Sequence, residues 1–189
     1  MRKGDELYFS PEYKFTDLNL DDKENLLIMF NDRVYGFYLN PAKELCEKKH
    51  AFAAGVICSS TIDFLAKIKY SNPTSRTNSK ANFITWLTEN IPSFSKQNAE
   101  KFYGNFRSGL IHGGKIDECG QFSFDFDELI KTISNKKDIM IVNPEILLKA
   151  IIDYFEKYIK YLKNDTEFKK FNDFLKKYFK EEIEYVSTS

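Results

Sequence analysis

Apolar residues recur at spacings of three and four over most of this 189-residue chain, which is the period of one face of an α-helix. In the first such segment Asp21 and Asp22 can cap a helix, and the apolar positions that follow are Leu26, Leu27, Phe30, Val34, Phe37 and Tyr38. Residues 51–58 are apolar on every side, which indicates the central and most buried helix. The pattern therefore predicts a mainly α fold in which helices pack on one another.

Turn and capping residues divide the rest of the pattern into further helices. These helices are expected from Pro41 to about Tyr70, from about Ser79 to Glu89, from near Asn98 to Gly113-Gly114, from Asn143-Pro144-Glu145 onward, and over 165–185. Asn40-Pro41 either breaks the first helix or begins the next one, because proline suits a first helical position. The result is a bundle of four to five core helices with a C-terminal helix.

Two segments depart from the helical period. Phe122–Phe126 alternates with period two and Asp138–Val142 is rich in β-branched residues, so they predict a small two-stranded β-ribbon with a short helical link. This ribbon is an insert over 116–142. Residues 1–20 show no sustained period and are expected to form an irregular N-terminal arm. Neither a repeat nor a long linker is visible, so 1–189 is interpreted as one domain.

Composition narrows the function classes. Lys plus Arg total 28 and Asp plus Glu total 28, and this balance argues against a protein that coats nucleic acid but permits a small phosphate site. A hydrophobic fraction of 42% excludes global disorder. Three cysteines, at 46, 58 and 119, fit a reducing compartment. With no signal peptide visible and the longest apolar stretch, 51–58, far short of a membrane span, we expect a soluble, cytoplasmic protein without a membrane partner.

The segment Tyr103–Gly114 is the most unusual in the chain. Five of the eight glycines fall between positions 104 and 120, together with one of four arginines, Arg107, and one of two histidines, His112. Glycine inside a helix costs about 1 kcal/mol relative to alanine, so Gly104 and Gly109 suggest close approach of another helix or of a ligand. Two copies of this helix packed together could bring arginine and histidine from both chains into one cleft.

Arg107-Ser-Gly-Leu-Ile-His112 at the end of a helix resembles the R-x4-6-H motif of the HEPN superfamily, and the order of helices over residues 22–162 is similar. The resemblance implies a HEPN-like helical bundle that forms a homodimer through the 98–112 helix. It also implies an endoribonuclease that needs no metal or other cofactor and leaves a 2′,3′-cyclic phosphate. Defence or toxin–antitoxin biology is the implied setting, with an antitoxin or other protein as a possible partner. Gly114 stands where one antitoxin-modified subset has tyrosine, and Ser108 where the family often has asparagine.

The residue types suit this chemistry. His112 can accept or donate a proton near neutrality, and the planar fork of Arg107 matches phosphate oxygens. Ser108 could position His112, which lies four residues later, so these three are the candidate catalytic residues. Asn105 and Lys115 are assigned to substrate binding. The alternative interpretation is that His112 only caps helix carbonyls and Arg107 pairs with a surface carboxylate.

Other candidate sites are interpreted as structural. Asp63 lies on a buried helix and could pair with Arg107, but a boundary position in contact with water is the favoured interpretation. Cys46 and His50 have helical spacing, yet two ligands make no closed metal site, so no metal centre is predicted. Eight lysines in 157–180 favour an amphipathic helix with a lysine face over a nucleic-acid track.

Three functional hypotheses remain. The first is a metal-independent HEPN-type ribonuclease with a composite dimeric site. The second is a catalytically silent HEPN-like dimer that acts as an RNA or nucleotide sensor or as a protein scaffold. The third is an unrelated bundle that contains the spacing by chance.

Overall fold

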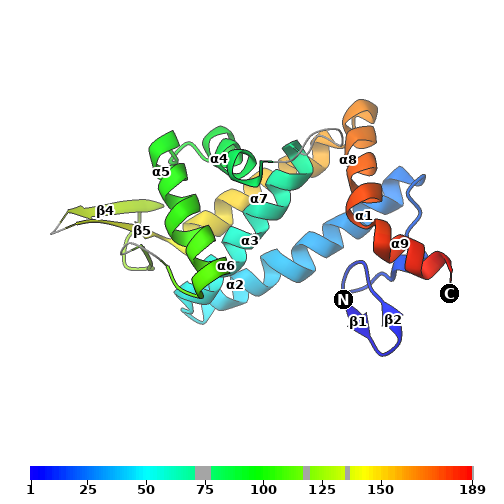
Figure 1. Ribbon diagram of the computed structural model, residues 1–189, viewed down its shortest axis with the longest axis horizontal. Coiled ribbons are helices and arrows are strands. Elements are labelled where there is room, and N and C mark those ends of the chain that lie inside the picture. The colour runs from blue at the N-terminus through cyan, green and yellow to red at the C-terminus, as the bar shows by residue number, and fades with distance from the viewer. Residues whose placement is uncertain (71–77, 117–119, 135–136, 189) are drawn as a thin grey trace.

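The computed structural model describes residues 1–70, 78–116, 120–134 and 137–188, except the side chains of Ile111 and His112. It is a mainly helical bundle with a small sheet at one end, so the expected fold class is confirmed (Figure 1). The sequence-predicted loop at 71–79 falls mostly outside the described residues.

The first long helix passes through Pro41 without a break. Helix α1 (Lys23–Val34) continues through the π-helical segment η2 (Tyr35–Leu39) into α2 (Asn40–Glu47). The Asn40 amide donates to the carbonyl of Tyr35, five residues back. Because proline has no N–H to continue the ordinary ladder, the wider π turn lets the chain remain helical at this point.

The predicted single helix from Pro41 to Tyr70 is wrong. It is divided at Lys48–His50, and α3 (Ala51–Tyr70) packs back against α2. Lys49 adopts the left-handed conformation at φ 59°, and the His50 amide donates to the Leu45 carbonyl at 2.8 Å. A left-handed residue with a backward hydrogen bond is a common helix terminator, and lysine gives little warning of it in the sequence.

Helix α3 is the buried centre of the bundle, as expected, and contacts α2, α4 and α7. Its apolar character extends over 20 residues, beyond the 51–58 stretch, and by length and composition alone it could cross a membrane. More than half of its apolar window is buried inside the molecule, as in the core helix of a soluble protein. This helix is therefore only weak evidence for a membrane span.

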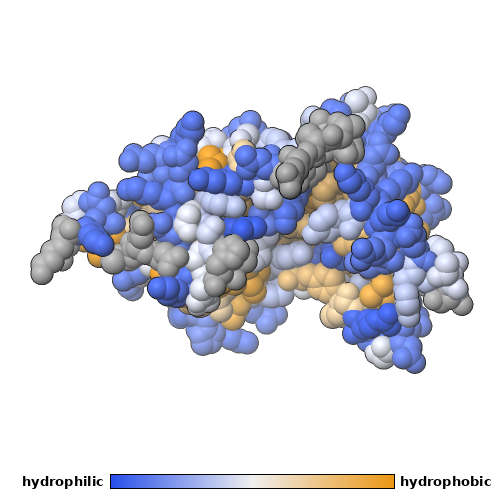
Figure 2. Space-filling view, viewed as in Figure 1, coloured by the Kyte–Doolittle hydropathy of each residue, from blue (hydrophilic) through white to orange (hydrophobic). Residues whose placement is uncertain are grey.

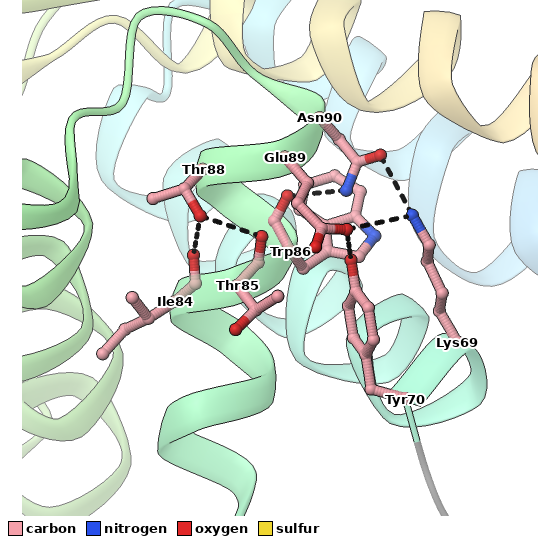
Figure 3. A network of polar contacts seen from close by, with 8 residues as sticks. All are labelled: Lys69, Tyr70, Ile84, Thr85, Trp86, Thr88, Glu89 and Asn90. Atoms are coloured by element: carbon pink, nitrogen blue, oxygen red, sulfur yellow. Dashed lines mark hydrogen bonds and ion pairs between the residues drawn. The ribbon is translucent and has the colours of Figure 1, made fainter.

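A polar network joins the C-terminal ends of α3 and α4 (Ser79–Asn90) (Figure 3). The Tyr70 hydroxyl donates to Glu89 at 2.5 Å, and Lys69 lies 3.6 Å from the same carboxylate. Burial first, and then the Glu89 carboxylate, raise the pKa of Tyr70. Asn90 accepts from Lys69 at 3.3 Å and donates to the Trp86 carbonyl at 2.7 Å. This network fixes α4 on α3 above the buried Trp86 ring.

The motif segment lies on a second interrupted helix. Helix α5 (Lys96–Lys101), the π-helical segment η3 (Phe102–Ser108) and α6 (Gly109–Gly113) are continuous. Gly114 ends the helix with φ 64°, a conformation that glycine adopts without strain, as the Gly113-Gly114 pair predicted. Arg107 therefore lies in π turns, which hold more residues per turn than an α-helix. The α-helical spacing of side chains around the axis cannot be used to relate position 107 to position 112.

The expected ribbon is present, but its strands differ from the prediction. Strand β5 (Asp138–Val142) pairs antiparallel with β4 (Ile130–Ser134) and parallel with the short β3 (Gln121–Phe122). The predicted helical link is thus wrong, because 130–134 contains three β-branched residues and forms the main partner strand. The sheet meets the helices where Phe122 lies over Gly55 of α3, and a Cβ at Gly55 would overlap the Phe122 ring.

The chain ends meet at the opposite end of the bundle (Figure 1). Helix α7 (Pro144–Tyr161) begins at the predicted Asn143 cap, and the predicted 165–185 helix is divided into α8 (Asp165–Tyr178) and α9 (Lys180–Ser187). The N-terminal arm holds a small hairpin, β1 (Arg2–Lys3) with β2 (Glu6–Leu7), and a 3₁₀ turn, η1 (Phe15–Asp17). Its Phe9 and Phe15 rings pack edge-on against Phe179, which lies where α8 turns into α9.

Candidate functional site

Arg107 lines a pocket between α3, the motif helix and the end of α8. The pocket has a volume of about 260 Å³. Its lining residues are Tyr38, Val56, Ser59, Ser60, Asp63, Phe64, Lys67, Arg107, Leu110 and Tyr178. The motif arginine is thus placed at the wall of a small pocket rather than on an open convex surface.

Three charged groups meet at this wall. One Arg107 nitrogen, Nη2, donates to both Asp63 oxygens at 3.3 and 3.2 Å, and Lys67 lies 2.8 Å from Asp63. The Asp63 and Arg107 side chains are only 13% and 15% exposed. The expectation that Asp63 meets water at a boundary is therefore wrong, and the less favoured pairing with Arg107 is correct. A carboxylate this buried needs such partners, because leaving it unpaired would cost several kcal/mol.

Arg107 is held by further contacts but is not saturated with hydrogen bonds. Its guanidinium lies 5.3 Å from the centre of the Tyr103 ring, within the range of a cation–π contact. Its Nε is buried and has no hydrogen-bond partner among the described residues. Asp63, Lys67 and Arg107 together carry a net charge of +1. The wall therefore carries an excess of positive charge that attracts an anion.

The lining of this pocket does not include Ser108, Asn105 or Lys115. Ser108 and Asn105 are partly exposed on η3, and the exposed Lys115 lies at a separate shallow hollow with Phe52 and Gln121. The backbone of His112 belongs to α6, while its side chain lies outside the described part of the structure. Its approach to Arg107, in one chain or across a dimer, stays a prediction.

The weak metal candidate does not form a helical pair. Cys46 is buried near the end of α2, whereas His50 is exposed in the turn beyond it, so the four-residue spacing does not lie on one helix. Burial raises the pKa of Cys46 to about 11. Within the described ranges, no cluster of three or more His, Cys, Asp and Glu side chains could hold a metal ion.

Several pocket residues were missed in the sequence. Lys67 could have been found, because it follows Asp63 by four residues on a predicted helix. Tyr38 and Tyr178 come from η2 and from the end of α8, and nothing in the local sequence links them to the motif.

The C-terminal lysine face contributes to the hydrophilic surface over α8 and α9 in Figure 2.

Comparison of the chain with protein-family models, with curated proteins and with solved structures finds no match. The resemblance to the HEPN superfamily thus rests on the six-residue motif and the order of helices.

Proposed function

We propose that this protein is a HEPN-type endoribonuclease that cleaves RNA without a metal ion. The observation that carries the proposal is the placement of Arg107, the motif arginine, at the wall of a pocket beside Lys67. An arginine fork and a second cation are suited to a phosphate whose negative charge grows during cleavage.

In the proposed reaction the 2′-oxygen of a ribose attacks the adjacent phosphorus while the bond to the 5′-oxygen breaks. One His112 imidazole takes the proton from the 2′-hydroxyl and another group, such as His112 of a second copy, gives a proton to the leaving 5′-oxygen. Arg107 and Lys67 stabilise the charge on the phosphate oxygens. The products are a 2′,3′-cyclic phosphate and a 5′-hydroxyl.

The same proposal includes a homodimer through the 98–112 helix, because one histidine cannot hold and release a proton at both oxygens at once. A defence or toxin setting, with an antitoxin or other partner, belongs to the HEPN resemblance alone.

The ion pair between Arg107 and Asp63 favours a second candidate function. The carboxylate already occupies Nη2 of Arg107, so an incoming phosphate would meet an arginine that is partly neutralised. A catalytically silent dimer that senses RNA or nucleotides would tolerate this pairing, because it needs moderate binding and no transition-state stabilisation.

The decisive experiment measures cleavage of a mixed single-stranded RNA in EDTA. His112→Ala and Arg107→Ala are each expected to lower the rate about 10²-fold or more. His50→Ala is the matched control, because it removes the other histidine, which is exposed and outside the pocket. Circular dichroism checks that each variant is folded.

Cleavage that persists in His112→Ala, or that EDTA abolishes, would contradict the proposal. RNA binding that depends on Arg107 without any cleavage would instead favour the silent dimer. Product ends are read by mass, since a 2′,3′-cyclic phosphate is one water lighter than an open phosphate.

A further inference from the structure

The pocket that contains Arg107 has an aromatic wall as well as a charged one. Tyr38 from η2 stacks on Phe64 from α3, with ring centres 5.5 Å apart and planes 16° apart. Tyr178, at the end of α8, lies 6.1 Å from Phe64 and remains 45% exposed. Three distant segments of the chain thus bring rings to a pocket whose other wall carries Lys67 and Arg107.

The partly buried Arg33 lies behind the aromatic wall. The Arg33 guanidinium lies 4.6 Å from the Phe179 ring centre and 5.1 Å from that of Phe9, and it interacts with Tyr38. No carboxylate forms an ion pair with Arg33 among the residues that the structure describes, although Glu182 acts on it from a distance. Its positive charge therefore adds to the attraction of the pocket for an anion.

We propose that this pocket binds one nucleotide unit, with its phosphate against Lys67 and Arg107 and its base against the exposed ring of Tyr178. This inference rests on the proposed function, since it names the part of an RNA strand that the site would hold. A nucleotide is the ligand that joins an anion to a planar aromatic group, and the pocket offers surfaces for both. The site would distinguish a nucleotide from a bare phosphate through Tyr178.

The size and exposure of the parts support a single unit. A volume of about 260 Å³ lies just under the ~300 Å³ at which sites for small molecules begin, so a run of several bases would not enter. Tyr38 is mostly buried beneath its neighbours, whereas Tyr178 stacks on Phe174 at 5.1 Å and is still 45% exposed, so part of its ring remains open to a ligand. Stacking on an aromatic side chain does not require a particular base, so the pocket would accept different nucleotides.

The experiment measures binding to the full chain by isothermal titration calorimetry with probes that cannot be cleaved. The probes are adenosine 3′-monophosphate, cytidine 3′-monophosphate, a 2′-O-methyl RNA hexamer and inorganic phosphate. A 2′-O-methyl group blocks the attacking oxygen, so binding is observed without reaction. Tyr178→Ala is expected to weaken the two nucleotides and the hexamer about 5- to 150-fold and to leave phosphate binding unchanged.

Two control variants test whether the loss of nucleotide binding is due to the ring at position 178. Tyr178→Phe retains the ring and should bind nucleotides nearly as the wild type does. Tyr161→Ala removes another exposed tyrosine, 54% accessible and not part of the pocket, and should change nothing. Equal losses in Tyr161→Ala and Tyr178→Ala, unchanged binding in Tyr178→Ala, or no binding of nucleotide or hexamer by the wild type would each overturn the inference.

The same measurements distinguish an RNA strand from a free nucleotide as the ligand. They also distinguish failure of the proposed ribonuclease activity from failure of the proposed nucleotide pocket. Tighter binding of the hexamer identifies a strand of RNA as the ligand, and tighter binding of the monophosphates identifies a free nucleotide. A protein that binds through Tyr178 but never cleaves unmodified RNA disproves the proposed activity and keeps the pocket. Cleavage with nucleotide binding unaffected in Tyr178→Ala disproves the pocket and keeps the activity.

Discussion

At the scale of single residues, Asp63 holds two cations that would otherwise repel each other. In Asp63→Asn, Arg107 and Lys67 lose their common counter-charge in a poorly exposed site. We expect the free energy of unfolding to fall by about 1–3 kcal/mol, measured by urea denaturation. Glu6→Gln breaks the exposed pair of Glu6 with Lys14 and should lower the free energy of unfolding by clearly less than Asp63→Asn does. Equal, small losses in both variants would show that the Asp63 pair does not stabilise the fold.

The same residues show how far the sequence could predict the site. Arg107 was identified from its motif, and Lys67 was within reach because it follows Asp63 by one helical turn. The pairing of Asp63 with Arg107 joins positions 44 residues apart, and local patterns carry no information on such a contact. Tyr178 was interpreted only as part of an amphipathic helix, since its place at the pocket depends on how α8 packs.

At the scale of elements, the contact between α3 and β3 depends on a glycine. Gly55→Ala puts a methyl group where the Phe122 ring lies, and we expect a loss of about 1–3 kcal/mol of stability on denaturation. In a Phe122→Ala background the same methyl meets no ring, so the added loss should nearly vanish. Gly113→Ala is the matched control, because a Cβ there would meet only the Lys115 side chain, at an ordinary contact distance of 3.5 Å. Additive losses for the Gly55 and Phe122 variants would refute this account of the contact.

Elements with their own capping residues were the predictable ones. The Asn143 side chain accepts hydrogen bonds from the amides of Glu145 and Ile146, as the Asn-Pro-Glu start of α7 indicated. The division between α2 and α3 was missed, because it depends on the left-handed backbone of Lys49 and on the packing of α3 against α2. Strand β4 was missed because a strand of five residues gains its stability from its partner strand rather than from local preference.

At the scale of the whole molecule, the N-terminal arm and the C-terminal helices pack together beside the pocket that contains Arg107. Arg33 lies against Phe9 of the N-terminal arm and Phe179 between the C-terminal helices, while the adjacent Tyr178 lines the pocket. An arm that shows no periodicity in the sequence thus packs into the core, since Phe9 is fully buried. The pocket is therefore built from parts that are remote in the chain, which local sequence patterns do not reveal.

The glycine at position 104 bears on assembly. The sequence led us to expect a close neighbour for Gly104, yet it is exposed and nothing within the described part of one chain comes within 4 Å of its Cβ position. A second copy of the motif helix would supply that neighbour, in keeping with the proposed homodimer through 98–112. Glycine allows two helices to approach closely, and this offsets its cost of about 1 kcal/mol inside a helix.

Gly104→Glu is accordingly expected to convert a dimeric wild type into a folded monomer, as measured by size-exclusion chromatography with light scattering. Two carboxylates would face each other across the two-fold axis, whereas within one chain the new side chain meets open space. Ile28→Glu is the control, because Ile28 is 55% exposed on α1, away from the motif helix, and its replacement should leave the dimer intact. A monomeric wild type, or a Gly104→Glu variant that stays dimeric, would remove the motif helix as the interface. Cleavage would then require both proton transfers within one chain.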